Sequence, residues 1–355
     1  SYRTGRASLA EGGVDVDGAL VRASKIIIAA GARPAIPAIP GLEDIDTLTS
    51  TTALEIETPP KSLLVLGGGY IGAELAQMFA RAGVTVTIVC RTRLLPSAEP
   101  EIGAALSGYL EAEGVRVVSG VTYRATSRTD QGVGLRVEQQ GTEVLLEAER
   151  LLLTAGRTPN TESLGLDAFG VHTRDGAILV DDRMRTSRPG VYAAGDVTGR
   201  DQFVYMAAYG AKIAAKNALN DDAFVYDATA MPAVVFTDPQ VASVGLTEAQ
   251  AKAQGRAVAT SVLQLEHLPR ALAARDTRGL IKLVADRASG VLLGAHILAP
   301  EGADSIQTAA LAIRQGLTVE DIGQMIFPYL TTVEGIKLAA LGFSKSVAKL
   351  SCCAG

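Results

Sequence analysis

Gly67-Gly68-Gly69-Tyr70-Ile71-Gly72 is the stretch of this 355-residue chain that decides the fold. An apolar run over residues 62–66 precedes it, a helical pattern follows over 71–82, and a second apolar run follows over 84–89. This order of strand, glycine turn, helix and strand is typical of a βαβ unit that binds a dinucleotide, because glycines let the backbone approach a pyrophosphate closely. The helix amino terminus then faces the phosphate charge. The residues predicted to hold the nucleotide are Gly67, Gly69 and Gly72.

The end of the second strand predicts which nucleotide binds. Sites for NAD place an Asp or Glu there, which bonds the 2′-hydroxyl of the ribose. Here the strand ends in Val89-Cys90-Arg91-Thr92-Arg93, and no carboxylate follows until Glu99. A guanidinium matches a phosphate in charge and in geometry, so Arg91 and Arg93 favour NADPH. The alternative is that both arginines are solvated surface residues.

Composition limits the classes of function. Hydrophobic residues make up 48% of the chain and charged residues 20%, which predicts ordinary folded cores. The net charge is -5, so we expect no nucleic-acid partner. No stretch approaches the ~18 uninterrupted apolar residues of a membrane span, so we expect no membrane partner. With only three cysteines, the chain does not have the pattern of a disulfide-stapled secreted fold, and a reducing cytoplasm is favoured.

A repeated pattern predicts the domain organisation. Ile27-Ile28-Ala29-Ala30-Gly31-Ala32-Arg33-Pro34 and the segment 151–159 both have an apolar strand followed by Ala-Gly, Arg and Pro. Two copies suggest two related nucleotide-binding domains, with the second inserted into the first. After residue 233, alternating strand patterns and helical patterns indicate an α+β domain. The predicted boundaries are 1–42 and 164–232 for the first domain, 43–163 for the inserted NADPH-binding domain and 233–355 for the C-terminal domain.

The segment Tyr192-Ala193-Ala194-Gly195-Asp196 is a strand that ends in Gly-Asp. A carboxylate at the carboxyl end of a strand, followed here by a helical pattern over 202–219, can bond a polyol hydroxyl of a bound cofactor. Asp196 could equally cap the helix that follows.

Cys352 and Cys353 are neighbours near the end of the chain. Consecutive Cα atoms lie about 3.8 Å apart, whereas unstrained disulfides prefer about 4.4–6.8 Å. A bond between these two thiols would therefore be strained. Two thiolates could instead hold one soft metal ion. The alternative is a pair of exposed thiols without a role.

Together, the Ala-Gly strands, the glycine turn, the Gly-Asp strand end and the C-terminal α+β pattern resemble the flavin-dependent pyridine-nucleotide disulfide oxidoreductases. Within that family, the chain is most similar to the members that reduce mercuric ion, Hg(II). This resemblance implies FAD/NAD(P)-binding Rossmann-like domains followed by an α+β dimerisation domain. It also implies FAD and NADPH as cofactors, Hg(II) as substrate and a homodimer. The segments that carry it are 231–240, 268–273, 327–331 and 351–355.

The resemblance also implies roles for individual residues. Tyr70 is implied to cover the nicotinamide pocket, and Glu74 to lie close to the nicotinamide. Cys352 and Cys353 are implied to receive Hg(II) and pass it to a buried thiol pair of the partner subunit. Tyr329 is implied to help hold the metal ion during this transfer. The residues implied to lie at FAD are Ala30, Gly31, Asp196 and Val204.

One segment separates the chain from the disulfide-reducing relatives, and another departs from the pattern of the members that reduce mercuric ion. Relatives that act on disulfides carry His-Pro-Thr-Leu-Ser-Glu where this chain has Phe327-Pro328-Tyr329-Leu330-Thr331-Thr332. The His–Glu pair that protonates a leaving thiol is therefore missing here, which favours a metal ion as substrate. The family's connector tyrosine is also missing from Asp46-Thr47-Leu48-Thr49-Ser50. Either Thr47 takes a weaker role, or Tyr329 alone carries the metal handover.

The family's first FAD-binding glycine motif and its Cys-x₄-Cys redox pair would precede Ser1. We therefore expect a truncated chain that retains FAD weakly and does not turn over Hg(II) by itself. Two alternatives stay open. The chain could be a related flavin-dependent reductase of a disulfide or another metal, or a remnant that binds nucleotide and metal without catalysis.

Overall fold

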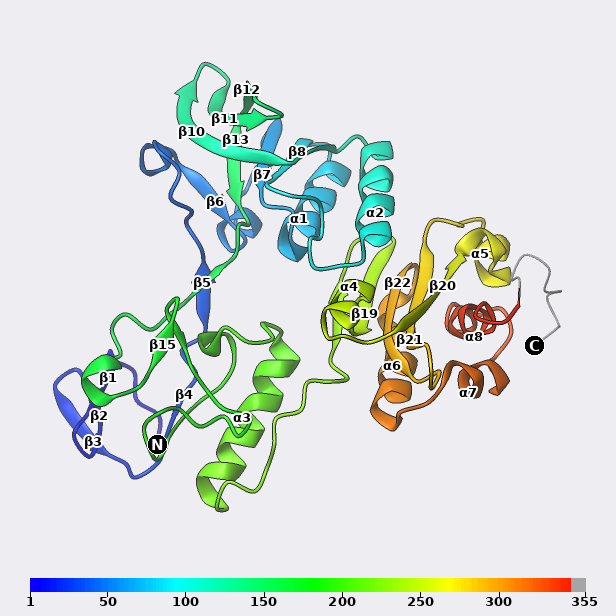
Figure 1. Ribbon diagram of the computed structural model, residues 1–355. Helices are drawn as coiled ribbons and strands as arrows, with labels where there is room; N and C mark the ends of the chain where they lie inside the picture. The colour runs from blue at the N-terminus through cyan, green and yellow to red at the C-terminus, as the bar shows by residue number, and fades with distance from the viewer. Residues whose placement is uncertain (346–355) are drawn as a thin grey trace. The chain divides into compact units, whose positions relative to one another are not determined.

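The computed structural model describes residues 1–345 of the chain. They form a mixed α/β structure, which confirms the expected fold class (Figure 1). The chain divides into two compact units. Unit 1 consists of Ser1–Ala35 and Gly156–Ala228, and unit 2 of Ile36–Ala155 and the segment from Thr229 onward. Among the described residues, no helix is both long and apolar enough to cross a membrane.

A five-stranded parallel sheet forms the centre of the first part of unit 2. Helices α1 (Tyr70–Arg81) and α2 (Pro100–Ala112) pack against this sheet (Figure 1). In sheet order, the strands are β6 (Thr47–Thr49), β13 (Arg150–Leu153), β7 (Ser62–Leu66), β8 (Thr85–Cys90) and β9 (Arg116–Ser119).

Both faces of this sheet are covered, which explains the continuous apolar run of β7. Side chains alternate between the faces of a strand. Leu63 and Val65 pack into the core formed with α1 and α2, whereas Leu64 and Leu66 pack into a second core. A three-stranded antiparallel sheet completes that second core; its strands are β10 (Val121–Thr129), β11 (Gly132–Gln139) and β12 (Thr142–Ala148).

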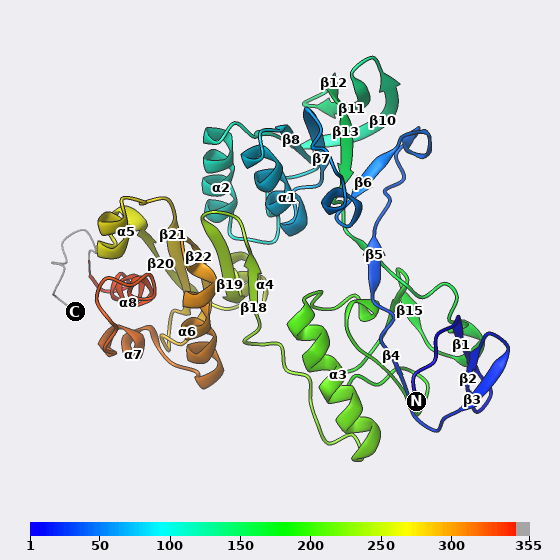
Figure 2. The same cartoon turned by 180° about the vertical axis from the view of Figure 1, so that it is seen from behind.

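The later part of unit 2 is built on a five-stranded antiparallel sheet (Figure 2). In sheet order its strands are β18 (Pro232–Val235), β19 (Gln240–Gly245), β22 (Leu292–Ala299), β21 (Leu280–Asp286) and β20 (Val258–Gln264). Helix α6 packs against β19 and β22, while α8 packs against β20, β21 and α7. The helices are α4 (Glu248–Ala253), α5 (Pro269–Ala274), α6 (Gly302–Gln315), α7 (Val319–Gln324) and α8 (Glu334–Leu341).

Unit 1 is organised around two parallel neighbours, β4 (Ile26–Ile28) and β17 (Val191–Ala193). Helix α3 (Val204–Leu219) packs against both strands. The two copies of the sequence repeat meet beyond β4, where β5 (Ala32–Pro34) pairs antiparallel with β14 (Arg157–Pro159). The other strands are β1 (Ala7–Ala10), β2 (Gly13–Val16), β3 (Ala19–Arg22), β15 (Thr173–Arg174) and β16 (Ala177–Ile178).

Within residues 1–345, five short 3-10 helices connect these elements. They are η1 (Leu42–Asp44), η2 (Thr52–Leu54), η3 (Asp167–Phe169), η4 (Asp196–Thr198) and η5 (Leu265–His267). The four-segment division expected from the sequence stays a prediction.

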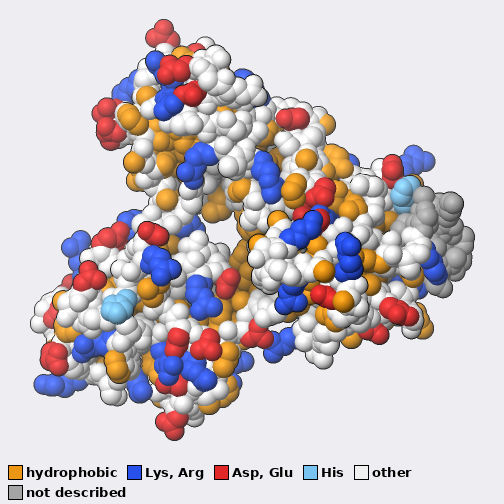
Figure 3. All heavy atoms as spheres, in the orientation of Figure 1, with side chains coloured by type: hydrophobic (Ala, Val, Ile, Leu, Met, Phe, Trp, Pro, Cys, Tyr) orange, Lys and Arg blue, Asp and Glu red, His pale blue; other side chains and the backbone are white. Residues whose placement is uncertain are grey.

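On the face of the molecule drawn in Figure 3, basic and acidic side chains are interspersed.

Candidate functional site

The glycine turn joins the carboxyl end of β7 to the amino end of α1. Gly67 has a φ of +122°, and a Cβ added there would lie 2.5 Å from the carbonyl oxygen of Thr154. A Cβ on Gly72 would lie 2.2 Å from the carbonyl oxygen of Gly67. A Cβ on Gly69 would meet no atom within 4 Å. Gly67 and Gly72 are therefore needed for the turn itself, whereas Gly69 borders open space.

The amino end of α1 suits an anionic ligand. Gly69 is its N-cap and provides no side-chain cap, and the first turn carries no acidic residue. The first N–H groups of a helix have no partner within the helix and carry a partial positive charge. No atom lies within 4 Å of a Cβ added at Gly69, so the backbone at this helix end is open to an anion such as a pyrophosphate. The residues present therefore fit a dinucleotide.

The two arginines predicted to contact the nucleotide lie differently. Arg91 follows β8 and is exposed. The Arg93 guanidinium is partly buried and donates hydrogen bonds to three backbone carbonyls, those of Leu95 (3.1 Å), Pro96 (2.9 Å) and Ala98 (2.6 Å). The structure thus leaves Arg91 at the surface beyond the strand, and turns Arg93 toward the loop that follows.

Tyr70 and Glu74 lie on the first two turns of α1. The hydroxyl of Tyr70 accepts a hydrogen bond from Ser97 at 3.4 Å. The Glu74 carboxylate accepts a hydrogen bond from the backbone N–H of Phe236 at 2.7 Å, just beyond β18. The helix that begins at the glycine turn is therefore bonded to the chain segment that opens the antiparallel sheet.

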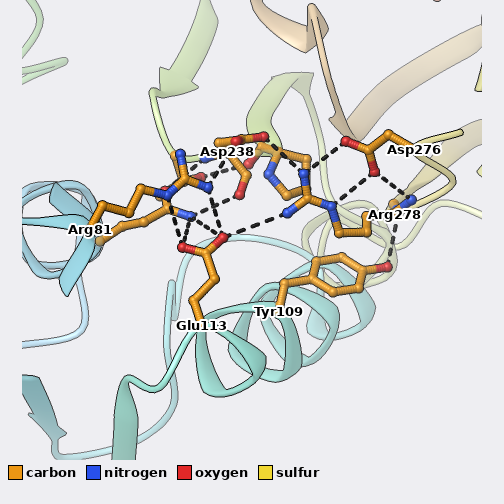
Figure 4. Close-up of polar contacts among 10 residues, drawn as sticks. Arg81, Tyr109, Glu113, Asp238, Asp276 and Arg278 are labelled. Atoms are coloured by element: carbon orange, nitrogen blue, oxygen red, sulfur yellow. Dashed lines mark hydrogen bonds and ion pairs between the residues drawn. The ribbon is translucent and has the colours of Figure 1, made fainter. Parts of the chain in front are cut away.

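Further along α1, two side chains bond the segment after β18. Gln77 is buried, accepts from the N–H of Asp238 and donates to the carbonyl of the same residue, both at 2.8 Å. Arg81 donates to Glu113 at 2.7 Å and to Asp238 at 2.8 Å, and its hydrogen bonds hold the pKa of Glu113 below its usual range (Figure 4). Arg278 bonds Asp238 from the other side at 3.2 Å (Figure 4).

This network of polar contacts continues beyond Arg278. Arg278 also pairs with Asp276 at 2.8 Å, and the Tyr109 hydroxyl on α2 accepts from the N–H of Gly279 at 2.9 Å (Figure 4). Both helices of the nucleotide-binding part are thus bonded to the antiparallel-sheet part. No local sequence pattern reveals the contacts between these two parts, because the partners are far apart along the chain.

A second polar cluster surrounds Lys282, whose side chain is 2% exposed. Its ammonium lies 3.0 Å from a carboxylate oxygen of Glu99, and 2.9 Å from Glu101 and from Glu248. Hydrogen bonds from Lys252 and Lys282 lower the pKa of Glu248 to about 2. A lysine in the otherwise apolar run Leu280-Ile281-Lys282-Leu283-Val284 is the sequence signal that could have revealed this cluster.

His296 lies beside this cluster on β22 and is buried. Its Nε2 atom lies 3.1 Å from the carbonyl oxygen of Leu246 and 3.8 Å from Glu99. Burial lowers the pKa of His296. The imidazole is therefore a packed side chain at the border of the Lys282 cluster.

The residues expected at FAD lie in unit 1, at the carboxyl ends of two neighbouring strands. Ala30 and Gly31 follow β4, and Asp196 follows β17. Gly31 has a φ of +68°, and a Cβ there would meet no atom within 4 Å. Val204 opens α3, which has no side-chain cap, and is 84% exposed. Open backbone, a carboxylate and an uncapped helix fit the phosphates and hydroxyls of a dinucleotide.

Arg157 and Asn160, for which the sequence predicted no role, bond the residues of this arrangement. Arg157 donates to the Asp196 carboxylate at 3.2 Å and to the carbonyl of Ala32 at 2.5 Å. Asn160 donates from its backbone N–H to Gly31 and from its side chain to Ala30, both at 3.0 Å. Both follow β13 in Ala155-Gly156-Arg157-Thr158-Pro159-Asn160, and the repeat of Ala-Gly, Arg and Pro in this segment was the available signal.

The segment that differs from disulfide reductases lies between α7 and α8. Tyr329 is 54% exposed, and the Thr332 hydroxyl donates to Glu301 at 3.0 Å. Thr47, at the place of the missing tyrosine, begins β6. Within residues 1–345, no group of three or more His, Cys, Asp or Glu could hold a metal ion. Cys352 and Cys353 lie outside the described residues.

Comparison with known proteins identifies the family. The profile of the pyridine nucleotide-disulphide oxidoreductases matches residues 3–214, and that of their dimerisation domain matches residues 231–340. Among solved structures, the Cu(II) complex of the HOCl-induced flavoprotein disulfide reductase RclA from Escherichia coli is 29% identical, with a TM-score of 0.85, and covers 95% of this chain and 78% of that one. LpdA from Mycobacterium tuberculosis is also 29% identical, with a TM-score of 0.81 over 94% of this chain and 72% of that one.

The curated relatives are more similar. A mercuric reductase from Staphylococcus aureus is 45% identical over 96% of this chain and 63% of its own length. One from Shigella flexneri is 48% identical over 95% of this chain and 60% of its own length. One from Streptomyces lividans is 46% identical over 95% of this chain and 71% of its own length. The chain thus spans about two thirds of the length of these relatives.

The chain belongs to the pyridine nucleotide-disulphide oxidoreductase family, whose cofactors are FAD and NADPH. Within that family its place is among the mercuric reductases. The resemblance inferred from the sequence is therefore confirmed, and so is the α/β fold with a dimerisation domain.

Proposed function

We propose that this chain acts in the NADPH- and FAD-dependent reduction of Hg(II) to Hg(0), which removes toxic mercuric ion from the cell. The observation that carries the proposal is the segment 327–332. It lacks the acid–base pair of disulfide reductases, in a chain that is 45–48% identical to mercuric reductases. Without that pair, a leaving thiol could not be protonated there, whereas transfer of electrons to a metal ion needs no such proton.

The overall reaction converts NADPH and Hg(II) into NADP⁺, H⁺ and Hg(0). When bound, NADPH supplies a hydride, and FAD carries its two electrons to Hg(II). The glycine turn and the amino end of α1 would hold the pyrophosphate, and Arg91 would bond the 2′-phosphate. Tyr70 and Glu74 would border the nicotinamide from the first two turns of α1. Asp196, Ala30, Gly31 and Val204 would hold FAD.

The metal ion would be handled by sulfur and by a tyrosine. Hg(II) is soft and prefers thiolate ligands, which suits Cys352 and Cys353. Tyr329, which is exposed between α7 and α8, would hold the ion as it passes to a thiol pair of the partner subunit. Because the ligands must be deprotonated, capture of Hg(II) would weaken as pH falls. The dimerisation domain supports a homodimer, and we place the protein in the cytoplasm.

The test compares three substrates of the intact enzyme, in which the family's FAD-binding glycine motif and Cys-x₄-Cys pair precede the residues of this chain. NADPH oxidation is measured with Hg(II) in excess thiol, with oxidised glutathione and with lipoamide. We expect turnover of Hg(II) and little turnover of either disulfide. A matched variant, Cys352→Ala with Cys353→Ala, should lose Hg(II) turnover while its NADPH affinity stays unchanged. Turnover of a disulfide equal to that of Hg(II) would overturn the proposal in favour of a disulfide reductase.

A further inference from the structure

The loop of residues 94–98 lies directly against the glycine turn. The backbone N–H of Leu95 donates a hydrogen bond to the carbonyl of Gly68 at 2.7 Å. A Cβ on Gly68 would lie 3.3 Å from the carbonyl oxygen of Arg93. Ser97 reaches the hydroxyl of Tyr70 at 3.4 Å. The loop therefore forms one wall of the proposed nucleotide site, and its shape affects everything that binds there.

This loop holds an uncommon backbone conformation. Leu95 is fully buried and has a φ of +46°, in the left-handed region that costs a non-glycine residue about 1–2 kcal/mol. Such a residue persists only where its surroundings fix it. Both main-chain groups of Leu95 are bonded, its N–H to Gly68 and its carbonyl to Arg93.

The Arg93 side chain binds this loop along most of its length. Three of its N–H groups donate to the carbonyls of Leu95, Pro96 and Ala98, so one planar guanidinium binds three points of the loop. Helix α2 makes room for it at Gly103, where a Cβ would lie 2.9 Å from the Nη1 atom of Arg93. These contacts direct the guanidinium inward, toward main-chain oxygens.

The far end of the loop is fixed by the Lys282 cluster. Glu99 is 1% exposed, and one of its carboxylate oxygens lies 3.0 Å from the Lys282 ammonium. The other oxygen accepts from the backbone N–H of Glu248 at 2.6 Å. A buried carboxylate with a buried cationic partner and a main-chain donor has little freedom to move.

We propose that Arg93 and Glu99 are positioning residues of the nucleotide site, and that Arg91 alone reads the 2′-phosphate of NADPH. This inference rests on the proposed function, because it assumes that NADPH binds at the glycine turn. It replaces the direct contact expected for Arg93 from the sequence. Arg93 supports the adenosine end of any dinucleotide by shaping loop 94–98, whether or not a 2′-phosphate is present.

The test measures dissociation constants for NADPH and for NADH by calorimetric titration of the full chain. For Arg91→Gln, we expect NADPH to bind about 10- to 100-fold more weakly and NADH to bind unchanged. For Arg93→Gln, the binding of both nucleotides should weaken by the same factor, roughly 3- to 30-fold. Arg93→Lys should behave like Arg93→Gln, because an ammonium keeps the charge but cannot bridge three carbonyls.

Two further variants complete the experiment. Arg116→Gln is the control, because Arg116 begins β9 at the amino ends of the parallel strands, opposite the glycine turn, and should change neither constant. Glu99→Gln should weaken the binding of both nucleotides equally, although it leaves both arginines in place. The binding stoichiometry of each titration separates a weaker site from a fraction of unfolded protein.

The outcomes discriminate between the two proposals. If Arg93→Gln weakens NADPH alone, Arg93 is a phosphate ligand and the inference is overturned. It is also overturned if Arg93→Lys keeps the affinity of the unsubstituted chain, or if Glu99→Gln changes neither constant. If the unsubstituted chain binds NADPH no better than NADH, the nucleotide assignment of the proposed function is wrong instead.

Discussion

Gly69 and Gly72 belong to the same motif, yet an added methyl group would meet very different surroundings at each. At Gly72 it would lie 2.2 Å from the Gly67 carbonyl oxygen, and at Gly69 it would point into open space. The backbone of Gly69, with φ −81° and ψ −171°, is one that alanine adopts without strain. One glycine thus serves the fold and the other the ligand.

We therefore expect opposite effects of two alanine substitutions. Gly69→Ala should change the free energy of unfolding by less than about 0.5 kcal/mol and weaken NADPH binding at least tenfold, because the methyl group occupies the pyrophosphate's space. Gly72→Ala should lower the free energy of unfolding by about 2 kcal/mol or more. Urea denaturation and nucleotide titration measure the two quantities. Unchanged NADPH affinity in Gly69→Ala would contradict the placement of the pyrophosphate.

The carboxylate of Glu248 predicts a dependence of stability on pH. Its pKa of about 2 in the folded protein lies below its ordinary value of 4.5. Its contribution to stability is therefore complete above pH 4.5 and is lost as pH falls toward 2. Glu248→Gln should remove this contribution, so the difference in unfolding free energy between the two proteins should be about 1 kcal/mol smaller at pH 4 than at pH 6. A difference independent of pH would show that the charge of Glu248 is not involved.

At the scale of elements, α1 and the segment after β18 are joined by polar side chains that lie three or four residues apart on one helix face. Glu74, Gln77 and Arg81 bond the main chain or side chain of Phe236 and Asp238. Residues at this spacing share a face of a helix. Gln77 is the buried member, and it satisfies both main-chain groups of Asp238.

Gln77→Leu should therefore destabilise the protein, although the two side chains are similar in size. The leucine fills a similar volume but leaves the N–H and carbonyl of Asp238 without partners, which costs about 1–3 kcal/mol. The midpoint of urea unfolding measures the loss. Gln324→Leu, at an exposed position of α7, serves as the control and should change the free energy by less than about 0.5 kcal/mol. Equal effects of the two substitutions would show that the Gln77 bonds contribute nothing.

In helix α2, one substitution should stabilise the protein. Gly108 lies in the interior of this helix, is exposed, and an added Cβ would meet no atom within 4 Å. Glycine in an exposed helix interior costs about 0.5–1 kcal/mol relative to alanine. Gly108→Ala should raise the free energy of unfolding by that amount in the same urea assay. A decrease would mean that Gly108 has a packing role that the chain's own contacts do not show.

The elements themselves were largely predictable from the sequence. A helix expected over 71–82 is observed as Tyr70–Arg81, and the strand expected over 62–66 is Ser62–Leu66. Apolar runs bounded by glycines carry this information locally. The contact of Lys282 with Glu99 joins residues 183 positions apart, so no local sequence pattern predicts it. Arg91 and Arg93 are the same residue type two positions apart, and only the structure shows which one turns inward.

At the scale of the whole molecule, the proposed homodimer makes a prediction about exposed apolar side chains. Ile326 is 98% exposed within the region that matches the dimerisation domain. Covering such a side chain against a partner subunit is favourable by about 1.5–3 kcal/mol. We expect the protein to sediment at twice the 36.8 kDa of one chain, and Ile326→Glu to shift it toward the monomer. Leu20→Glu, on β3, is the control and should leave the dimer intact. A monomeric unsubstituted protein would contradict the proposed assembly.

The three hydrogen bonds from Arg93 end on main-chain oxygens, and this has a consequence for protein engineering. Every residue type carries a carbonyl, so replacing Pro96 or Ala98 leaves the acceptors of these bonds in place. A library that varies position 91 together with positions 96 and 98 therefore explores cofactor preference on a backbone that keeps its shape, provided that Arg93 is held constant. Selection from such a library for NADH-dependent activity should return changes at Arg91.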